Sequence, residues 1–336
     1  MLRKTWARFI AIAALLLAGV LAFILARPAK AESRWGEKYF TDIQLINQDG
    51  KTVHFYNDLI KGKIVAIYLF YTHCQYSCPL ETARLVQVQK MLGDRVGKDI
   101  FFYGISIDPK RDNPEALRAY MEKFHVGPGW TFLTGKKEDI EFLSRKLGLY
   151  SDPGESLDGH MPDLLIGNDP MGQWMRNSAL DNPLFIARTI GEFIDGGKNM
   201  KPASGKSYTQ ASAIKFDKGK YLFARQCAAC HTIGHGDKIG PDLMGVTNVR
   251  NRDWLVNVIE RPDQLLEQKD PLATALLKKY NNVLMPNLRL NDEETNYLIR
   301  FLVVQSSVND REASVTENAG AATSGDGGGA RAGNPK

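Results

Sequence analysis

The chain contains four cysteines in two pairs, and the spacing within each pair is typical of redox chemistry. Cys227 and Cys230 are separated by two residues, and His231 follows at once. Two thiols at this spacing can form thioether bonds with the vinyl groups of haem, and the histidine then becomes the proximal ligand of the iron. The alternative is a zinc-type or redox-active cysteine pair that a histidine follows by chance. The motif predicts haem c, attached through Cys227 and Cys230 and ligated by His231.

The residues after this motif favour a complete haem domain. Residues 239–243 read Ile-Gly-Pro-Asp-Leu, and the region 214–305 has helical periodicity without strands. This region resembles class I cytochrome c, in which a Gly-Pro-x-Leu turn lies against the proximal histidine. A thioether is then expected as sixth ligand on the opposite haem face. Met285 fits, because it lies in a loop before the last predicted helix. Met244 is the rival, but it belongs to the segment expected on the proximal side.

The second cysteine pair, Cys74 and Cys78, lies in a different setting. A β-branched and aromatic run at residues 63–71 predicts a buried strand, and residues 80–92 have helical periodicity. Thiols at positions i and i+4 in the first turn after a strand would share one face, and a helix N-terminus favours the thiolate. Copper(I) binding and thiol–disulfide exchange both require thiolates. A structural disulfide, or two buried thiols, is the alternative reading.

A third ligand separates a metal site from a redox pair. His160 lies just before a predicted strand at residues 163–167, in a loop that passes close to the cysteine-bearing helix in a thioredoxin-type sheet. Two thiolates and one imidazole form a trigonal set that suits copper(I) and, with one more ligand, copper(II). His73, next to Cys74, is a weaker candidate ligand.

The patterning along the chain predicts two folded domains, as its 336 residues suggest. Residues 33–197 alternate between strands and helices, which indicates a partly parallel sheet covered on both faces. Residues 198–213 are rich in Gly, Ser, Lys and Pro and form the predicted linker. The all-α domain follows at 214–305, and residues 306–336 are predicted to be disordered. The expected strands lie at 63–71, 100–107, 131–133, 163–167 and 173–175, and the expected helices at 80–92, 114–124, 137–147, 185–194, 215–227, 252–260, 271–279 and 292–304.

The first 31 residues have the pattern of an export signal or a membrane anchor. Arg3, Lys4 and Arg8 precede an apolar run at residues 9–26, and an Ala-Lys-Ala sequence ends at Ala31. The run is long for a cleaved signal and close to the length that spans a bilayer, so both readings stay open. In either case the basic flank stays inside. The expected location is the periplasmic side of the bacterial inner membrane, where haem is attached to such motifs.

The composition excludes one class of partner. A formal net charge of +5 is small for a chain of this length, and the basic residues are spread along it. Nucleic-acid binding is therefore not expected.

Residues 33–197 resemble the Sco/SenC family of thioredoxin-fold copper proteins. The resemblance is carried by Cys74-x-x-x-Cys78-Pro79, the segment 106–112 (Ser-Ile-Asp-Pro-Lys-Arg-Asp), the segment 130–135 and His160. It implies Cys74, Cys78 and His160 as copper ligands, with Asp108 and Asp112 as acids that support these ligands or dock a partner. It also implies a function in the assembly of the copper A site of cytochrome c oxidase. The partners would be the oxidase subunit that carries this site and other redox proteins.

Three functions follow for the fused chain. It is a copper metallochaperone with its own haem domain, a thiol–disulfide oxidoreductase that acts on the oxidase cysteines, or an electron carrier whose first domain serves for docking. Haem with histidine and methionine ligands has a high potential, whereas protein disulfides lie at roughly −100 to −300 mV. Such a haem is a poor reductant for a disulfide, so one-electron exchange with copper is the more favourable coupling. The sequence therefore favours the metallochaperone over a turnover enzyme.

Overall fold

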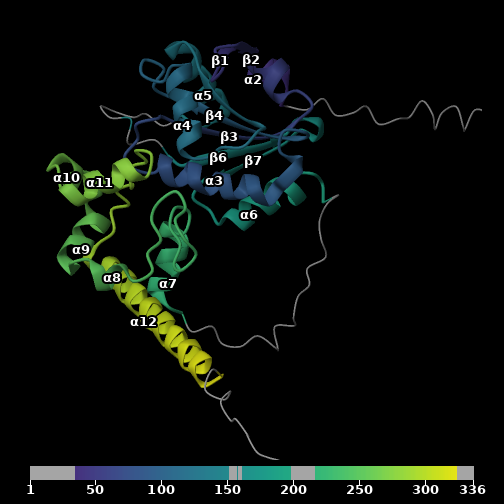
Figure 1. The fold of residues 1–336 in the computed structure, drawn as a ribbon. Helices are drawn as coiled ribbons and strands as arrows, with labels where there is room; N and C mark the ends of the chain where they lie inside the picture. The colour runs from purple at the N-terminus through teal and green to yellow at the C-terminus, as the bar shows by residue number, and fades with distance from the viewer. Residues whose placement is uncertain (1–34, 151–156, 158–160, 198–215, 324–336) are drawn as a thin grey trace, which may run out of the picture.

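The structure, a computed structural model, describes residues 35–150, 157, 161–197 and 216–323 (Figure 1). The predicted anchor, the predicted linker and His160 lie outside these ranges. Among the described residues, no helix has both the length and the apolar character needed to cross a bilayer.

The first domain is built on one seven-stranded sheet with the order β2-β1-β5-β4-β3-β6-β7. The central strands β3, β4 and β5 are parallel, and the flanking pairs are antiparallel. This confirms a partly parallel sheet in a mixed α/β domain. The strand bounds are β1 Gln44–Asn47, β2 Thr52–His54, β3 Ile64–Phe70, β4 Ile100–Ser106, β5 Trp130–Thr134, β6 Asp163–Asn168 and β7 Gln173–Ser178.

Helices cover both faces of this sheet, as predicted. Every residue of β3 is buried, because alternate side chains pack into two separate cores. The first core lies under α3 (Cys78–Leu92), α4 (Pro114–Lys123) and α6 (Pro183–Arg188). The second lies under α2 (Glu37–Phe40), the π-helix η1 (Phe55–Ile60) and α5 (Lys137–Leu147). Strand β3 is thus central, and Tyr71 and Cys74 of the loop that leaves it pack into the first core.

Several elements differ from the sequence-based expectations. The hairpin β1–β2 and helix α2 were not predicted, because strands of four and three residues are too short to show a period. The closing helix, expected at residues 185–194, begins at Pro183, where the Asn182 side chain accepts a hydrogen bond from the N–H of Leu184. After Arg188 it continues as the π-helix η5 (Thr189–Phe193).

The second domain is helical and packs against the α3 side of the first (Figure 1). Its predicted helices at 252–260 and 271–279 are confirmed. The last helix was predicted to end at residue 304, whereas α12 continues to Thr323. No proline interrupts this stretch, and extending an established helix costs little. The helices are α7 Lys218–Leu222, η7 Phe223–Cys227, α8 Val246–Val249, α9 Arg252–Glu260, α10 Pro262–Glu267, α11 Pro271–Lys279 and α12 Asp292–Thr323.

Candidate functional site

Cys74 and Cys78 lie side by side at the junction between β3 and α3. Helix α3 begins at Cys78, so Cys74 belongs to the preceding loop and not to the first helical turn as expected. The two sulfurs are nevertheless in contact, because the Cys78 thiol donates a hydrogen bond to Cys74. Cys74 is 2% exposed and Cys78 is 0% exposed. Within the described residues, no disulfide joins any of the four cysteines.

The two thiols have opposite electrostatic environments. The hydrogen bond from Cys78 is the main cause that lowers the pKa of Cys74 to about 6, and N–H groups of Cys78 and Tyr76 add to it against the effect of burial. Burial raises the pKa of Cys78 well above its usual range, and its hydrogen bond to Cys74 raises it further. At neutral pH the pair therefore consists of one thiolate and one thiol.

This asymmetry predicts the pH profile of Cys74 alkylation. In the reduced protein, the rate should rise with pH through about 6 and level off above neutrality, because the thiolate is the reactive form. Mass spectrometry of iodoacetamide-treated peptides measures the rate. Cys78→Ala removes the donated hydrogen bond and should move the midpoint toward about 8.5, the ordinary thiol value. A wild-type midpoint already near that value would contradict the assigned pair.

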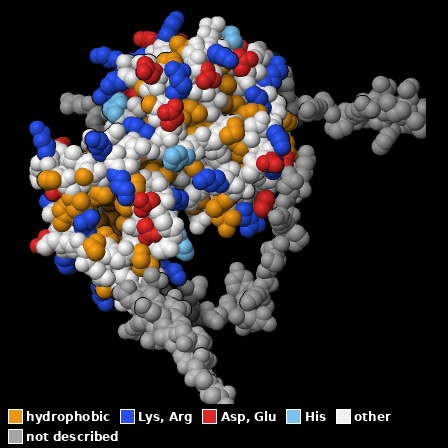
Figure 2. All heavy atoms as spheres, in the orientation of Figure 1, with side chains coloured by type: hydrophobic (Ala, Val, Ile, Leu, Met, Phe, Trp, Pro, Cys, Tyr) orange, Lys and Arg blue, Asp and Glu red, His pale blue; other side chains and the backbone are white. Residues whose placement is uncertain are grey.

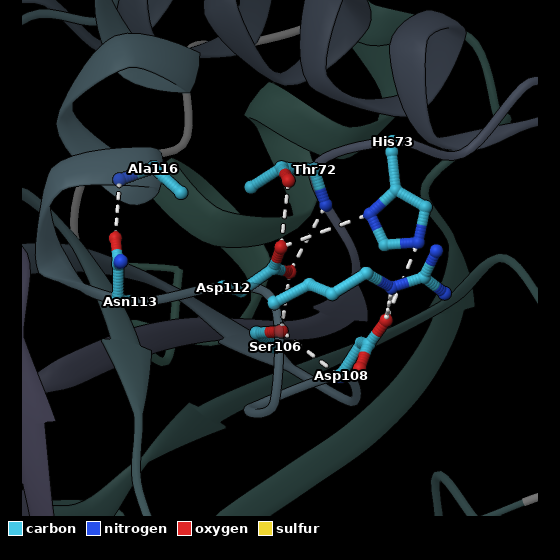
Figure 3. Close-up of polar contacts among 8 residues, drawn as sticks. Thr72, His73, Ser106, Asp108, Asp112, Asn113 and Ala116 are labelled. Atoms are coloured by element: carbon cyan, nitrogen blue, oxygen red, sulfur yellow. Dashed lines mark hydrogen bonds and ion pairs between the residues drawn. The ribbon is translucent and has the colours of Figure 1, made fainter.

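The buried carboxylate of Asp112 holds the loop that carries Cys74 (Figure 3). It accepts hydrogen bonds from the Thr72 hydroxyl at 2.6 Å, the Thr72 N–H at 3.0 Å and the Ser106 hydroxyl at 2.6 Å. Ser106 ends β4 and pairs with Phe70 at the end of β3, so Asp112 ties the ends of two parallel strands together. Asp112 is 0% exposed and offers no surface to a docking protein. Its geometry is that of a residue that positions the cysteine loop.

The imidazole ring of His73 lies between the carboxylates of Asp108 and Asp112 (Figure 3). Its Nε2 lies 3.3 Å from Asp108, and its Nδ1 lies 3.9 Å from Asp112. Asp108 is also held by the Arg111 guanidinium at 2.6 Å. The imidazole is therefore engaged with carboxylates beside the cysteine pair.

Glu81 was missed by the sequence analysis. It lies one helical turn after Cys78, a spacing that places it on the same face of α3, and it is fully buried. Burial is the main cause that raises its pKa to about 8. At neutral pH the carboxyl is protonated, so it adds no negative charge beside the thiolate.

The haem motif of the second domain has the geometry of a proximal ligand. His231 Nδ1 lies 2.8 Å from the carbonyl oxygen of Pro241, which fixes this nitrogen as the donor and leaves Nε2 for a metal. Burial lowers the pKa of His231, which keeps the ring neutral. A Cβ atom on Gly240 would lie 2.7 Å from the imidazole, so only glycine permits this approach of the turn. The expected Gly-Pro turn thus does lie against His231.

Asp242 organises the loop after the motif. Its carboxylate accepts hydrogen bonds from the Thr232 hydroxyl and from the N–H groups of Gly234, Gly236 and Met244. Desolvation would raise its pKa, but these bonds hold the pKa well below its usual range. The loop around His231 is therefore closed by a carboxylate that stays ionised.

The two candidate methionines occupy different segments. A Cβ atom on Gly234 would lie 2.9 Å from the Met244 methyl group, so Met244 packs against the His231 loop. Met285 is half-buried in the extended segment before α12, away from that loop in the chain. His235 is exposed. This arrangement keeps Met285 as the candidate for the second axial position.

The helical domain suits a large apolar group. Figure 2 shows hydrophobic side chains gathered over α9, α10 and α11. Many leucines of this domain are only half-buried, which leaves apolar area for a flat ring to cover. The donor set, the neutral imidazole and this apolar lining therefore fit haem c. The half-buried leucines are Leu265, Leu266, Leu272, Leu276 and Leu277.

Comparison with known proteins assigns the two domains. Residues 31–163 match the SCO1/SenC family model, and residues 216–305 match the cytochrome c family model. The SCO2-like protein of Rickettsia felis is 32% identical over 163 residues, which are 46% of this chain and 75% of that protein. The chain belongs to the SCO1/SenC family. Its SCO1/SenC domain is fused to a cytochrome c domain, which implies haem c as a cofactor.

A second curated relative agrees with this assignment. A SCO2-like protein of Rickettsia conorii is 33% identical over 149 residues, covering 42% of this chain and 69% of that protein. A solved SCO1/SenC family lipoprotein from Bacillus anthracis is 30% identical, with a TM-score of 0.39, and covers 44% of this chain and 90% of that structure.

Proposed function

We propose that this SCO1/SenC protein is a copper metallochaperone and redox assembly factor for the copper A site of cytochrome c oxidase. Cys74, Cys78 and His160 are the proposed copper ligands. The observation that supports this most is the pairing of two buried cysteines, in which a hydrogen bond from the Cys78 thiol lowers the pKa of Cys74 to about 6. A thiolate is the ligand that copper(I) prefers, and binding needs the loss of only one further thiol proton.

The surroundings of the pair also suit a soft monovalent cation. The site lies in the first core of the α/β domain, where apolar packing excludes water from the sulfurs. Glu81 is neutral there, so no carboxylate on that side attracts a hard divalent ion. Asp112 holds Thr72 and hence the loop of Cys74. The protein can thus keep its sulfurs in place before copper arrives.

The cytochrome c domain supports the redox part of the proposal. Haem c supplies reversible one-electron chemistry when bound. We assign Cys227 and Cys230 to its attachment, and His231 and Met285 to the axial positions. The carbonyl of Pro241 holds the His231 ring in one orientation, which keeps its ligating nitrogen available.

Location and partner follow from the proposed function. The chain would act on the periplasmic side of the bacterial inner membrane, anchored by its N-terminal segment or exported. Its partner would be the oxidase subunit that carries the copper A site. Copper content of the oxidase, measured in cells with and without this protein, tests the partnership. An unchanged copper A content in its absence would contradict it.

A thiol–disulfide oxidoreductase is the second candidate. The specific observation in its favour is the same asymmetry, since one lowered and one raised thiol pKa are typical of an attacking and a resolving cysteine. This function needs both cysteines but does not need His160.

Copper(I) titration separates the two functions. The reduced full-length protein should bind about one equivalent at the thiol site, and Cys74→Ser should abolish that binding. His160→Ala should weaken copper binding at least about tenfold and leave disulfide exchange intact. His235→Ala, at an exposed histidine of the other domain, is the control and should change neither. If His160→Ala keeps full copper affinity, the oxidoreductase becomes the better assignment.

A further inference from the structure

The cytochrome c domain contacts the α/β domain directly beside the cysteine pair. Residues 281–289, here named the cap loop, form the extended segment between α11 and α12. The N–H of Asn287 donates a hydrogen bond to the carbonyl oxygen of Gln75 at 3.0 Å. The Arg289 guanidinium lies 5.1 Å from the centre of the Tyr76 ring, within the range of a cation–π interaction. Both contacted residues lie between Cys74 and Cys78.

The cap loop also packs on the apolar core that contains both thiols. Val283 and Leu288 contact this core from the outside. Asn282, Val283 and Leu284 form one wall of a cleft of about 260 Å³. The rest of the lining comes from the α/β domain and includes Thr72, His73 and Cys74 of the loop after β3, and Ala116, Ala119 and Lys123 of α4. Cys74 and the second domain therefore line the same cleft.

A second contact region fixes the same orientation. Ala229 and Cys230 of the haem motif, and Ile239 of the turn that follows it, pack against the same core. The cytochrome c domain thus meets the α/β domain through two separated segments, and both lie along α3. Because two separated segments make contact, the two domains share a defined interface.

The backbone of the cap loop is shaped for this position. Asn281, Asn282 and Arg289 have φ angles of 54°, 54° and 53°, in the left-handed region. Asparagine tolerates this conformation, whereas an arginine in it is strained. The strained residue is the one whose side chain lies over Tyr76.

We infer that the face of the α/β domain around Cys74 is a docking surface, and that the cap loop of the same chain occupies it and restricts access to the thiol pair. A protein that exchanges copper with Cys74 and Cys78 must then displace the cap loop. Such a partner would offer what the loop offers, which is an extended segment with a backbone N–H for Gln75, a cation for Tyr76 and apolar side chains for the cleft. The link to copper exchange rests on the proposed function, but the capping itself does not.

Thiol accessibility tests the cap. The rate of Cys74 alkylation by iodoacetamide is measured in the reduced, copper-free, haem-loaded full-length protein at neutral pH. Val283→Asp places a carboxylate in the apolar contact and should raise the rate at least about tenfold. Arg289→Glu replaces the cation over Tyr76 by an anion and should raise it about threefold. Both variants should keep the absorption spectrum of methionine-ligated haem.

Matched controls lie on α12 of the same domain. Val304→Asp and Arg300→Glu introduce the same changes at exposed positions and should leave the alkylation rate unchanged. If Val283→Asp alters the haem spectrum, Arg289→Glu decides the result. An alkylation rate equal to that of the wild type in Arg289→Glu, with an intact spectrum, would overturn the cap. Since no copper is present, a failed cap and a failed copper site are distinguishable.

Discussion

Asp112→Ala is expected to lower the free energy of unfolding of the α/β domain by about 3 kcal/mol. The substitution removes a fully buried carboxylate that accepts three hydrogen bonds. It leaves the hydroxyl groups of Thr72 and Ser106 and one N–H without their acceptor inside the protein. Urea unfolding followed by circular dichroism measures the loss. Because Thr72 lies two residues before Cys74, copper(I) affinity should fall in parallel.

A surface carboxylate gives the matched control. Asp99 pairs with Arg95 at 2.6 Å, and half of its side chain is exposed. Asp99→Ala should therefore change the free energy of unfolding by no more than about 0.5 kcal/mol. If Asp112→Ala destabilises the protein no more than this control does, the buried carboxylate is not what holds the cysteine loop.

Gly240→Ala is expected to displace the proximal histidine of the cytochrome c domain. The added Cβ would lie 2.7 Å from Cε1 and 3.1 Å from Nδ1 of His231, so the ring or the turn must move. Either movement breaks the hydrogen bond between Nδ1 and the Pro241 carbonyl. We expect a changed haem spectrum, a shifted midpoint potential and a loss of about 2 kcal/mol in the stability of this domain.

Gly236→Ala separates this clash from backbone strain. Gly236 has a φ angle of 80°, and a Cβ there would have no atom within 4 Å. This control should cost about 1 kcal/mol and leave the haem spectrum unchanged. A wild-type spectrum and potential in Gly240→Ala would show that the close contact does not position His231.

Much of the fold was predictable because the central strands are continuous apolar runs and the main helices have a clear helical period. The strands at residues 64–70 and 100–106 are long apolar runs, and α5, α9 and α11 are bounded by the residues that the sequence suggested. The hairpin of β1 and β2 was not predictable in this way. Its stability comes from pairing with β5, a contact between residues far apart in the chain. The length of α12 was also missed, since composition favoured disorder there.

The features of the candidate sites also fall into those that local sequence determines and those that long-range packing determines. Both cysteine motifs and the Gly-Pro turn could be predicted from the sequence, because each lies within a few consecutive residues whose covalent spacing limits the geometry. Three findings could not be predicted from the sequence: the burial of Asp112, the neutral carboxyl of Glu81 and the hydrogen bond between Asn287 and Gln75. Each depends on how the ends of β3 and β4, or two separate domains, pack together. Long-range packing determines which side chains are buried, and burial in turn shifts their pKa values. A local pattern of residue types does not determine this packing.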